Sequence, residues 1–187
     1  MATTADFRNG LCFNHNGGPW KIESFLHVKP GKGPAFVRTK IRNLKTGRLL
    51  ENTFTSGVKI DVIRIENRKY QFLYAERNDY HLMNNDDYEQ IMMQKDSIDN
   101  VQFLKEGDNV EVLFHADKGI PLSAQVPSHV LLEISFTEPG VKGNTATNTF
   151  KPAKTETGAD IQVPLFINEG DRIKIDTEKG AYIERVK

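Results

Sequence analysis

The stretch that decides the fold is Lys29-Pro30-Gly31-Lys32-Gly33-Pro34, which separates two runs of strand-forming residues, 22–28 and 35–42. In the second run, the odd-numbered residues from Ala35 to Ile41 are small or apolar, and the even-numbered residues from Phe36 to Arg42 are mostly cationic. Such strict alternation is typical of a β-strand with one buried face. Two such runs joined by a short segment rich in glycine and proline predict a β-hairpin. Lys32 is then expected at the tip of that hairpin.

The composition of the loop predicts a stiff arm. Pro30 and Pro34 restrict the backbone angle φ at their own positions and favour extended geometry in the residues before them. Gly31 and Gly33 have no Cβ atom, so the backbone can approach a bulky surface closely. We therefore expect the loop to project the side chain of Lys32. Behind the tip, one face of the second strand carries a ring and three cations: Phe36, Arg38, Lys40 and Arg42.

Other interpretations of the loop can be weighed against this one. A solvated hairpin tip is the ordinary alternative, because lysine is common at exposed turns. A Walker A phosphate loop is excluded, since that motif requires Ser or Thr directly after its Gly-Lys and Lys32 is followed by Gly33. A Schiff-base lysine usually lies in a desolvated pocket rather than on a loop tip. The loop alone thus leaves a solvated turn and a functional cation as alternatives.

The formal charge of the chain is zero, but it is distributed unevenly. Residues 1–64 hold 11 Lys/Arg and 4 Asp/Glu, residues 65–128 hold 6 and 12, and residues 129–187 hold 8 and 9. A basic first third is the distribution that contacts with nucleic-acid phosphates require. The residues predicted to contact RNA are Lys29, Phe36, Arg38, Lys40 and Arg42.

The rest of the chain predicts an all-β protein. Short strands separated by Gly-rich turns are typical of small barrels, and they group into three consecutive domains, 1–64, 65–128 and 129–187. One short helix is predicted in the second domain. Asn84 and Asn85 are good N-cap residues for a helix from about Asp86, whose carboxylate suits the first turn.

Patterns typical of enzymes are missing from the sequence. The single cysteine, Cys12, allows neither a disulfide framework nor a cysteine-based metal site within one chain. The five histidines lie far apart without metal-ligand spacing, and we expect all of them to be exposed or half-buried. There is no nucleophile elbow and no dinucleotide fingerprint. We therefore predict a protein that is not an enzyme and that needs neither a metal nor a cofactor.

The sequence also carries no membrane signal. No apolar run approaches the roughly 20 residues needed to cross a bilayer. The first residues do not combine a basic region with an apolar core, as a signal peptide would. These observations predict a cytoplasmic protein without a membrane partner.

Two separate blocks resemble bacterial translation elongation factor P. The first comprises residues 28–38, Thr46-Gly47 and residues 51–54, and the start of the chain, 6–10, fits as well. The second block reproduces the family's C-terminal signature: Lys151-Pro152-Ala153, Gly158, Ile161, Val163-Pro164-Leu165 and Gly170. With its matching length, the resemblance covers essentially the whole chain.

The resemblance implies a fold and a function. The fold would be an SH3-like barrel in the first domain, followed by two OB-fold barrels. The function would be to bind the ribosome between the peptidyl and exit tRNA sites and to relieve stalling at consecutive prolines. Lys32 would be the loop tip that positions peptidyl-tRNA, and the expected partners are the 70S ribosome with its rRNA and peptidyl-tRNA. The protein is expected to act as a monomer.

The resemblance also raises alternatives. Many family members carry the tip lysine in modified form, so Lys32 is a candidate modification site and a Lys32-modifying enzyme a candidate partner. Pro34 departs from many lysine-modifying members, which favours an unmodified Lys32. The family's Gly-Asp-Thr loop, expected near the messenger side of the exit site, is Gly143-Asn144-Thr145 here. An elongation factor P-like paralogue with another stalling preference and a general RNA-binding barrel protein stay open as alternatives.

Overall fold

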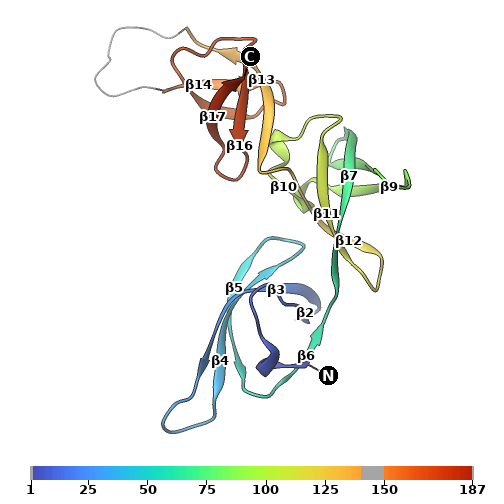
Figure 1. Cartoon of the computed structure of the whole chain (residues 1–187), viewed down its shortest axis with the longest axis vertical. Coiled ribbons are helices and arrows are strands. Elements are labelled where there is room, and N and C mark those ends of the chain that lie inside the picture. The colour runs from blue at the N-terminus through green and yellow to red at the C-terminus, as the bar shows by residue number, and fades with distance from the viewer. Residues whose placement is uncertain (1, 140–149, 187) are drawn as a thin grey trace. The chain divides into compact units, whose positions relative to one another are not determined.

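The computed structural model describes residues 2–139 and 150–186 (Figure 1). Its regular structure is almost entirely β, from β1 at the N-terminus to β17 at the C-terminus, which confirms the all-β prediction. The described helices are three-residue 3-10 segments: Thr4–Asp6, Lys95–Ser97 and Val101–Phe103. None of these described helices has the length and hydropathy needed to cross a membrane.

The first sheet contains the predicted hairpin. Its strands follow the order β1 (Ala2–Thr3), β6 (Lys59–Val62), β2 (Cys12–His15), β3 (Gly18–Val28), β4 (Phe36–Asn43) and β5 (Leu49–Thr55). The pairing of β3 with β4 is antiparallel and ends with Val28 opposite Phe36. The seven residues 29–35 therefore form the loop, one residue longer than predicted, because β4 begins at Phe36 and not at Ala35.

The inner face of this sheet encloses a small core. Its buried residues are Phe7, Leu11, Phe13, Trp20, Ile22, Val37 and Ile41. Phe54 of β5 packs against it, with its ring centroid 5.5 Å from that of Phe7 in an edge-on arrangement. Trp20 satisfies its only polar atom by donating from Nε1 to the His15 carbonyl at 2.8 Å. Because Phe13 of β2 and Phe54 of β5 pack against each other, with ring centroids 5.9 Å apart, the sheet curls around this core as a small barrel would.

A β-bulge in the hairpin decides which side chains face outward. The register of β3 against β4 shifts between Ile22 and Ser24, so that Glu23 is an extra residue in β3. Without the bulge, Ile22 and Leu26 would share one face of the strand, because side chains alternate with a period of two. With the bulge, Ile22 is completely buried while Leu26 is 61% exposed.

The second sheet corresponds to the middle of the chain. Its order is β10 (Ile98–Asp99), β12 (Ile120–Gln125), β11 (Asn109–His115), β7 (Ile65–Glu76), β8 (Asp79–Asn84) and β9 (Gln90–Gln94). Its inner residues include Tyr70, Phe72, Leu82 and Met93, all buried.

The helix predicted from about Asp86 is wrong. The Asn84 side chain does accept a hydrogen bond from the Asp86 amide at 2.9 Å, as an N-cap residue would. The chain then reverses, because Tyr88 adopts a positive φ of 61° and the Asn84 amide bonds to the Glu89 carbonyl at 2.8 Å. Residues 90–94 continue as β9. The capping interaction thus closes a hairpin turn, and the helical segments of this region are the 3-10 segments after β9.

The third sheet has five strands in the order β15 (Asp160–Pro164), β14 (Phe150–Thr155), β13 (His129–Thr137), β16 (Arg172–Asp176) and β17 (Ala181–Val186). Its core residues include Leu132, Ile134, Val163, Ile167, Ile173 and Ile175. The loop residues Gly143, Asn144 and Thr145 lie outside the described residues.

The chain divides into two compact units, residues 1–68 with 112–124, and residues 69–111 with 125–187. Within the first unit, Leu44, Ile63 and Leu122 form a second buried cluster, and Leu113 of β11 packs against it. The three predicted domains, 1–64, 65–128 and 129–187, stay a prediction.

One histidine differs from the expectation. His115, at the end of β11, is only 5% exposed, and its two ring nitrogens have no hydrogen-bond partner among the described atoms. It follows Leu113 on the same face of the strand, the face that packs against the Leu44 cluster. Because both faces of the last residues of β11 are covered, a residue expected near the surface is buried.

The bulge makes a prediction about stability. Ile22→Ala should lower the free energy of unfolding by about 2–5 kcal/mol, because it leaves a cavity in the core. Leu26→Ala, on the same strand, should lower it by no more than about 0.5 kcal/mol, as an exposed position allows. Urea unfolding of both variants measures the difference. Equal losses at the two positions would contradict the bulged register.

Candidate nucleic-acid interface

The hairpin loop presents Lys32 to solvent. Residues 29–34 are all exposed, and Lys32 forms no hydrogen bond or ion pair with a described residue. Gly33 has a φ of +105°, which a residue with a side chain would adopt only under strain. A built Cβ at Gly33 would lie 4.0 Å from Pro30 Cγ, so backbone angle rather than space requires glycine there.

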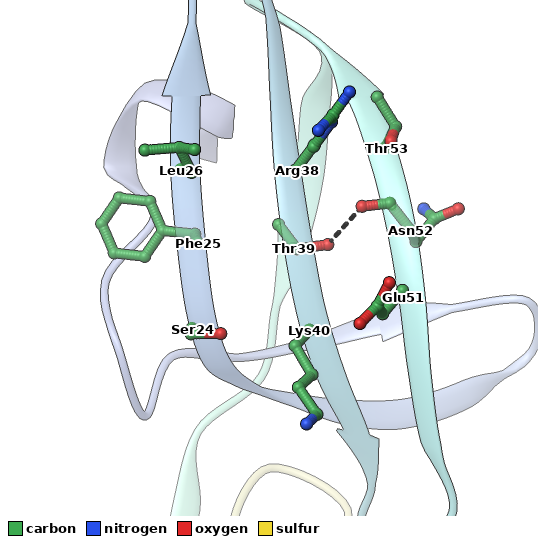
Figure 2. A pocket seen from close by; sticks show the side chains of 9 residues that line it. All are labelled: Ser24, Phe25, Leu26, Arg38, Thr39, Lys40, Glu51, Asn52 and Thr53. Atoms are coloured by element: carbon green, nitrogen blue, oxygen red, sulfur yellow. Dashed lines mark hydrogen bonds between the residues drawn. The ribbon is translucent and has the colours of Figure 1, made fainter.

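The predicted alternation along β4 is confirmed. Val37, Thr39 and Ile41 are buried, whereas Arg38 and Lys40 are exposed. Thr39 faces inward and satisfies its hydroxyl by donating to the Asn52 carbonyl at 2.9 Å (Figure 2). The two cations therefore stand on the outer face of the sheet.

Two rows of side chains cross this outer face. In the first, Arg38 lies between Leu26 of β3 and Thr53 of β5. In the second, Lys40 stands between Ser24 and Glu51. These residues line an open hollow of about 540 Å³ on the three strands, and Figure 2 shows their side chains. The hollow offers two cations, a carboxylate, hydroxyls and an apolar side chain to a ligand.

The cations of β4 differ in how far they are committed to other groups. Arg38 lies over the ring of Phe36, with Cζ 5.6 Å from its centroid, a cation–π arrangement that keeps the guanidinium close to an aromatic platform. Neither Arg38 nor Lys40 forms an ion pair with a described residue. Both charges are therefore open to an external anion.

Arg42 already forms an ion pair within its own sheet. Its Nε donates to Glu23 Oε1 at 2.8 Å, and its Nη1 donates to the Gly47 carbonyl at 3.3 Å. Lys21 Nζ lies 3.4 Å from the same Glu23 oxygen. The hydrogen bond from Arg42, aided by both positive charges, lowers the pKa of Glu23. The carboxylate thus stays ionised, and this pair is lost only when the pH falls through that lowered pKa.

The structure thus brings together most of the predicted RNA-contact residues, but it does not make them equivalent. Phe36, Arg38, Lys40 and Arg42 share the outer face of β4, and Lys29 is exposed in the loop. Sequence reasoning missed Leu26 and Thr53, which flank Arg38. Leu26 could not be found from the alternation of β3, because the bulge reverses it.

A hairpin-bearing sheet with an exposed cation at the hairpin tip is followed by two further curled β-sheets. Comparison with protein families identifies this arrangement. Models described as "Elongation factor P (EF-P) KOW-like domain", "Elongation factor P (EF-P) OB domain" and "Elongation factor P, C-terminal" match residues 3–60, 65–122 and 130–185. The chain belongs to the elongation factor P family.

Curated relatives match over the full chain. "Elongation factor P" of Azobacteroides pseudotrichonymphae and that of Flavobacterium psychrophilum are each 57% identical over 187 residues, which are 100% of both chains. "Elongation factor P 1" of Porphyromonas gingivalis is 56% identical with the same coverage. The protein is therefore a translation elongation factor, and its family implies association with the ribosome.

A solved structure is similar in fold. "Eukaryotic translation initiation factor 5A from Methanococcus jannaschii" superposes with a TM-score of 0.53 at 20% identity, covering 67% of this chain and 90% of that chain. This likeness supports the SH3-like and OB barrels of the prediction and shows the fold alone.

The unequal cations make a prediction about salt. Arg38→Gln and Lys40→Gln should each weaken ribosome binding and reduce the slope of log K against log salt by about 0.7–0.9, one phosphate contact each. Arg42→Gln serves as the matched control and should change the slope less, because that charge is already paired with Glu23. Binding measured over a series of salt concentrations checks this. Equal slope changes for Arg38→Gln and Arg42→Gln would contradict the assignment.

Proposed function

We propose that this elongation factor binds the ribosome between the peptidyl and exit tRNA sites and stimulates peptide-bond formation at consecutive prolines. In this proposal the Lys32 loop holds peptidyl-tRNA in a reactive pose. The ribosome performs the chemistry, and the protein, which is not itself an enzyme, supplies the geometry.

The observation that carries the proposal is that the side chain of Lys32 is exposed and unpaired in the described part of the chain. Its charge stands at the end of a seven-residue arm, exposed and without a partner among the described residues. Some surface lysines pair with a carboxylate, as Lys154 does with Asp160 at 2.7 Å, whereas the restrained loop presents Lys32 to solvent. An uncommitted cation on a restrained loop suits contact with the phosphates and sugars of a tRNA end.

Proline explains why such an arm is useful. A prolyl residue has a locked φ and a hindered secondary amine, so donor and acceptor are poorly placed for attack. Holding the reacting groups in a productive orientation lowers the entropic part of the barrier. Because Pro30 and Pro34 restrain the arm beforehand, less conformational entropy is lost when it docks.

The outer face of β4 supports the same proposal. Arg38 and Lys40 can contact tRNA or rRNA phosphates, and the Phe36 ring can pack against a sugar or base. The outer face of β4 would then supply most of the affinity for the ribosome, and Lys32 would accelerate peptide-bond formation. The loop at Gly143-Asn144-Thr145 stays a candidate for the messenger side of the exit site.

The separate roles of the β4 face in binding and of Lys32 in acceleration are tested by Lys32→Ala in a purified translation assay. A messenger encoding consecutive prolines is compared with a proline-free control. The variant should keep its fold and most of its ribosome affinity, because the side chain carries no packing. It should lose the acceleration on prolines by about tenfold or more. The matched control is Lys45→Ala, an exposed lysine of the β4–β5 turn, which should retain full activity.

Two outcomes would change the proposal. If Lys32→Ala relieves the stall as well as the parent protein, the loop is a passive turn and a general RNA-binding role is favoured. The assay requires parent protein in which Lys32 is unmodified, and intact-mass measurement checks this. If only protein with an adduct on Lys32 is active, a Lys32-modifying enzyme becomes a required partner.

A further inference from the structure

The outer face of β7, β8 and β9 carries a row of exposed apolar and aromatic side chains. Tyr74, His81 and Met92 are direct neighbours across the three strands. The rings of Tyr74 and His81 stack, with centroids 4.4 Å apart and planes 18° from parallel. Tyr74 is 46% exposed and Met92 is 54% exposed. We call these three residues the Tyr74 row.

The Tyr74 row is not needed for the core of this sheet. The core lies on the opposite face, where Phe72, Leu82 and Met93 are buried. A register shift between Phe72 and Tyr74 turns Tyr74 outward, in the same way as the bulge in β3 exposes Leu26. A contiguous row of large apolar groups on a sheet surface is typical of an interaction site.

The surroundings of the Tyr74 row are acidic. At one end, Glu76 pairs with Asp79 across the β7–β8 hairpin, and Asp79 pairs with Gln94 of β9. At the other end lies the β8–β9 turn, which is fully exposed between residues 85 and 89. Residues 74–96 contain only two basic residues, Arg77 and Lys95. The acidic side chains are Glu76, Asp79, Asp86, Asp87, Glu89 and Asp96.

These carboxylates are not neutralised by the protein itself. None of the six forms an ion pair with a residue in the described ranges. Asp79 accepts a hydrogen bond from the neutral Gln94 amide, and Asp87 accepts one from the Glu89 backbone at 3.0 Å. Their negative charge is therefore directed to solvent on both sides of the apolar row.

We propose that the Tyr74 row is the docking surface for a basic polypeptide segment. Arginine and lysine have apolar stems that can lie on Tyr74 and Met92 while their charged heads reach the flanking carboxylates. Leucine or valine side chains between them would cover the rest of the row. The partner is thus a strand or loop in which cations alternate with apolar residues.

Charge argues against the other occupants. The unpaired carboxylates would repel the phosphates of a nucleic acid, whose binding depends on cations. A second copy of this chain that docked through the same face would bring like charges and would be repelled as well. The proposal stands apart from the role of Lys32, which lies in the first barrel, so either can fail without the other.

The test uses the full chain and a short synthetic peptide of alternating arginine and leucine. Its affinity is measured by fluorescence anisotropy, and its site is mapped by amide NMR shifts. The shifts should centre on the Tyr74 row. Tyr74→Ala and the double variant Glu76→Gln/Asp79→Asn should each weaken binding by about tenfold or more, as interface anchors do.

Matched controls separate this site from general attraction. Phe136→Ala removes another exposed aromatic ring, and Glu106→Gln/Asp117→Asn removes the same charge elsewhere; both should leave the affinity within about twofold. Thermal unfolding establishes that Tyr74→Ala is folded. The proposal is overturned if the two charge variants weaken binding equally, if shifts centre elsewhere, or if single-stranded oligouridylate binds the row more tightly than the peptide.

Discussion

The pairing of β3 with β4, including its bulge at Glu23, is the constraint on which the candidate interface depends. The extra residue lets Ile22 fill the core of the first barrel while Leu26 stands beside Arg38 on the outer face. It also places Glu23 where it can neutralise Arg42. One inserted residue thus sets both the shape of the outer face and the number of cations available on it.

Among the described residues, unpaired positive and negative charges lie on different surfaces of the protein, and these surfaces suit different partners. In the first barrel, free cations are left at Arg38, Lys40 and the loop tip, while Arg42 is held by a carboxylate of its own sheet. On the outer face of β7–β9 the free charges are negative and flank Tyr74. Phosphates fit the first surface and a basic polypeptide fits the second, and both kinds of surface are abundant in a large ribonucleoprotein.

Local patterns predicted the hairpin, the alternation in β4 and the all-β class, because each of these is set by neighbouring residues. They failed where pairing partners decide. The outward orientation of Leu26 depends on the bulge, which no local pattern indicates. Asn84 caps a turn and not the predicted helix, because Tyr88 adopts a left-handed conformation. His115 is buried because both faces are covered at the end of β11. The role of Lys32 rests on exposure and lack of partners, which only three-dimensional structure reports.

The most direct measurement concerns the stiffness of the arm, since Pro34→Gly keeps the charge of Lys32 and removes one restraint. Ordering a freed residue costs about 1 kcal/mol or more, so peptide-bond formation between prolines should slow by about fivefold. The rate should be measured at saturating factor on ribosomes that carry prolyl peptidyl-tRNA. Slower reaction with unchanged ribosome affinity is the predicted result. A Pro34→Gly protein that supports the full rate would contradict positioning by a restrained arm.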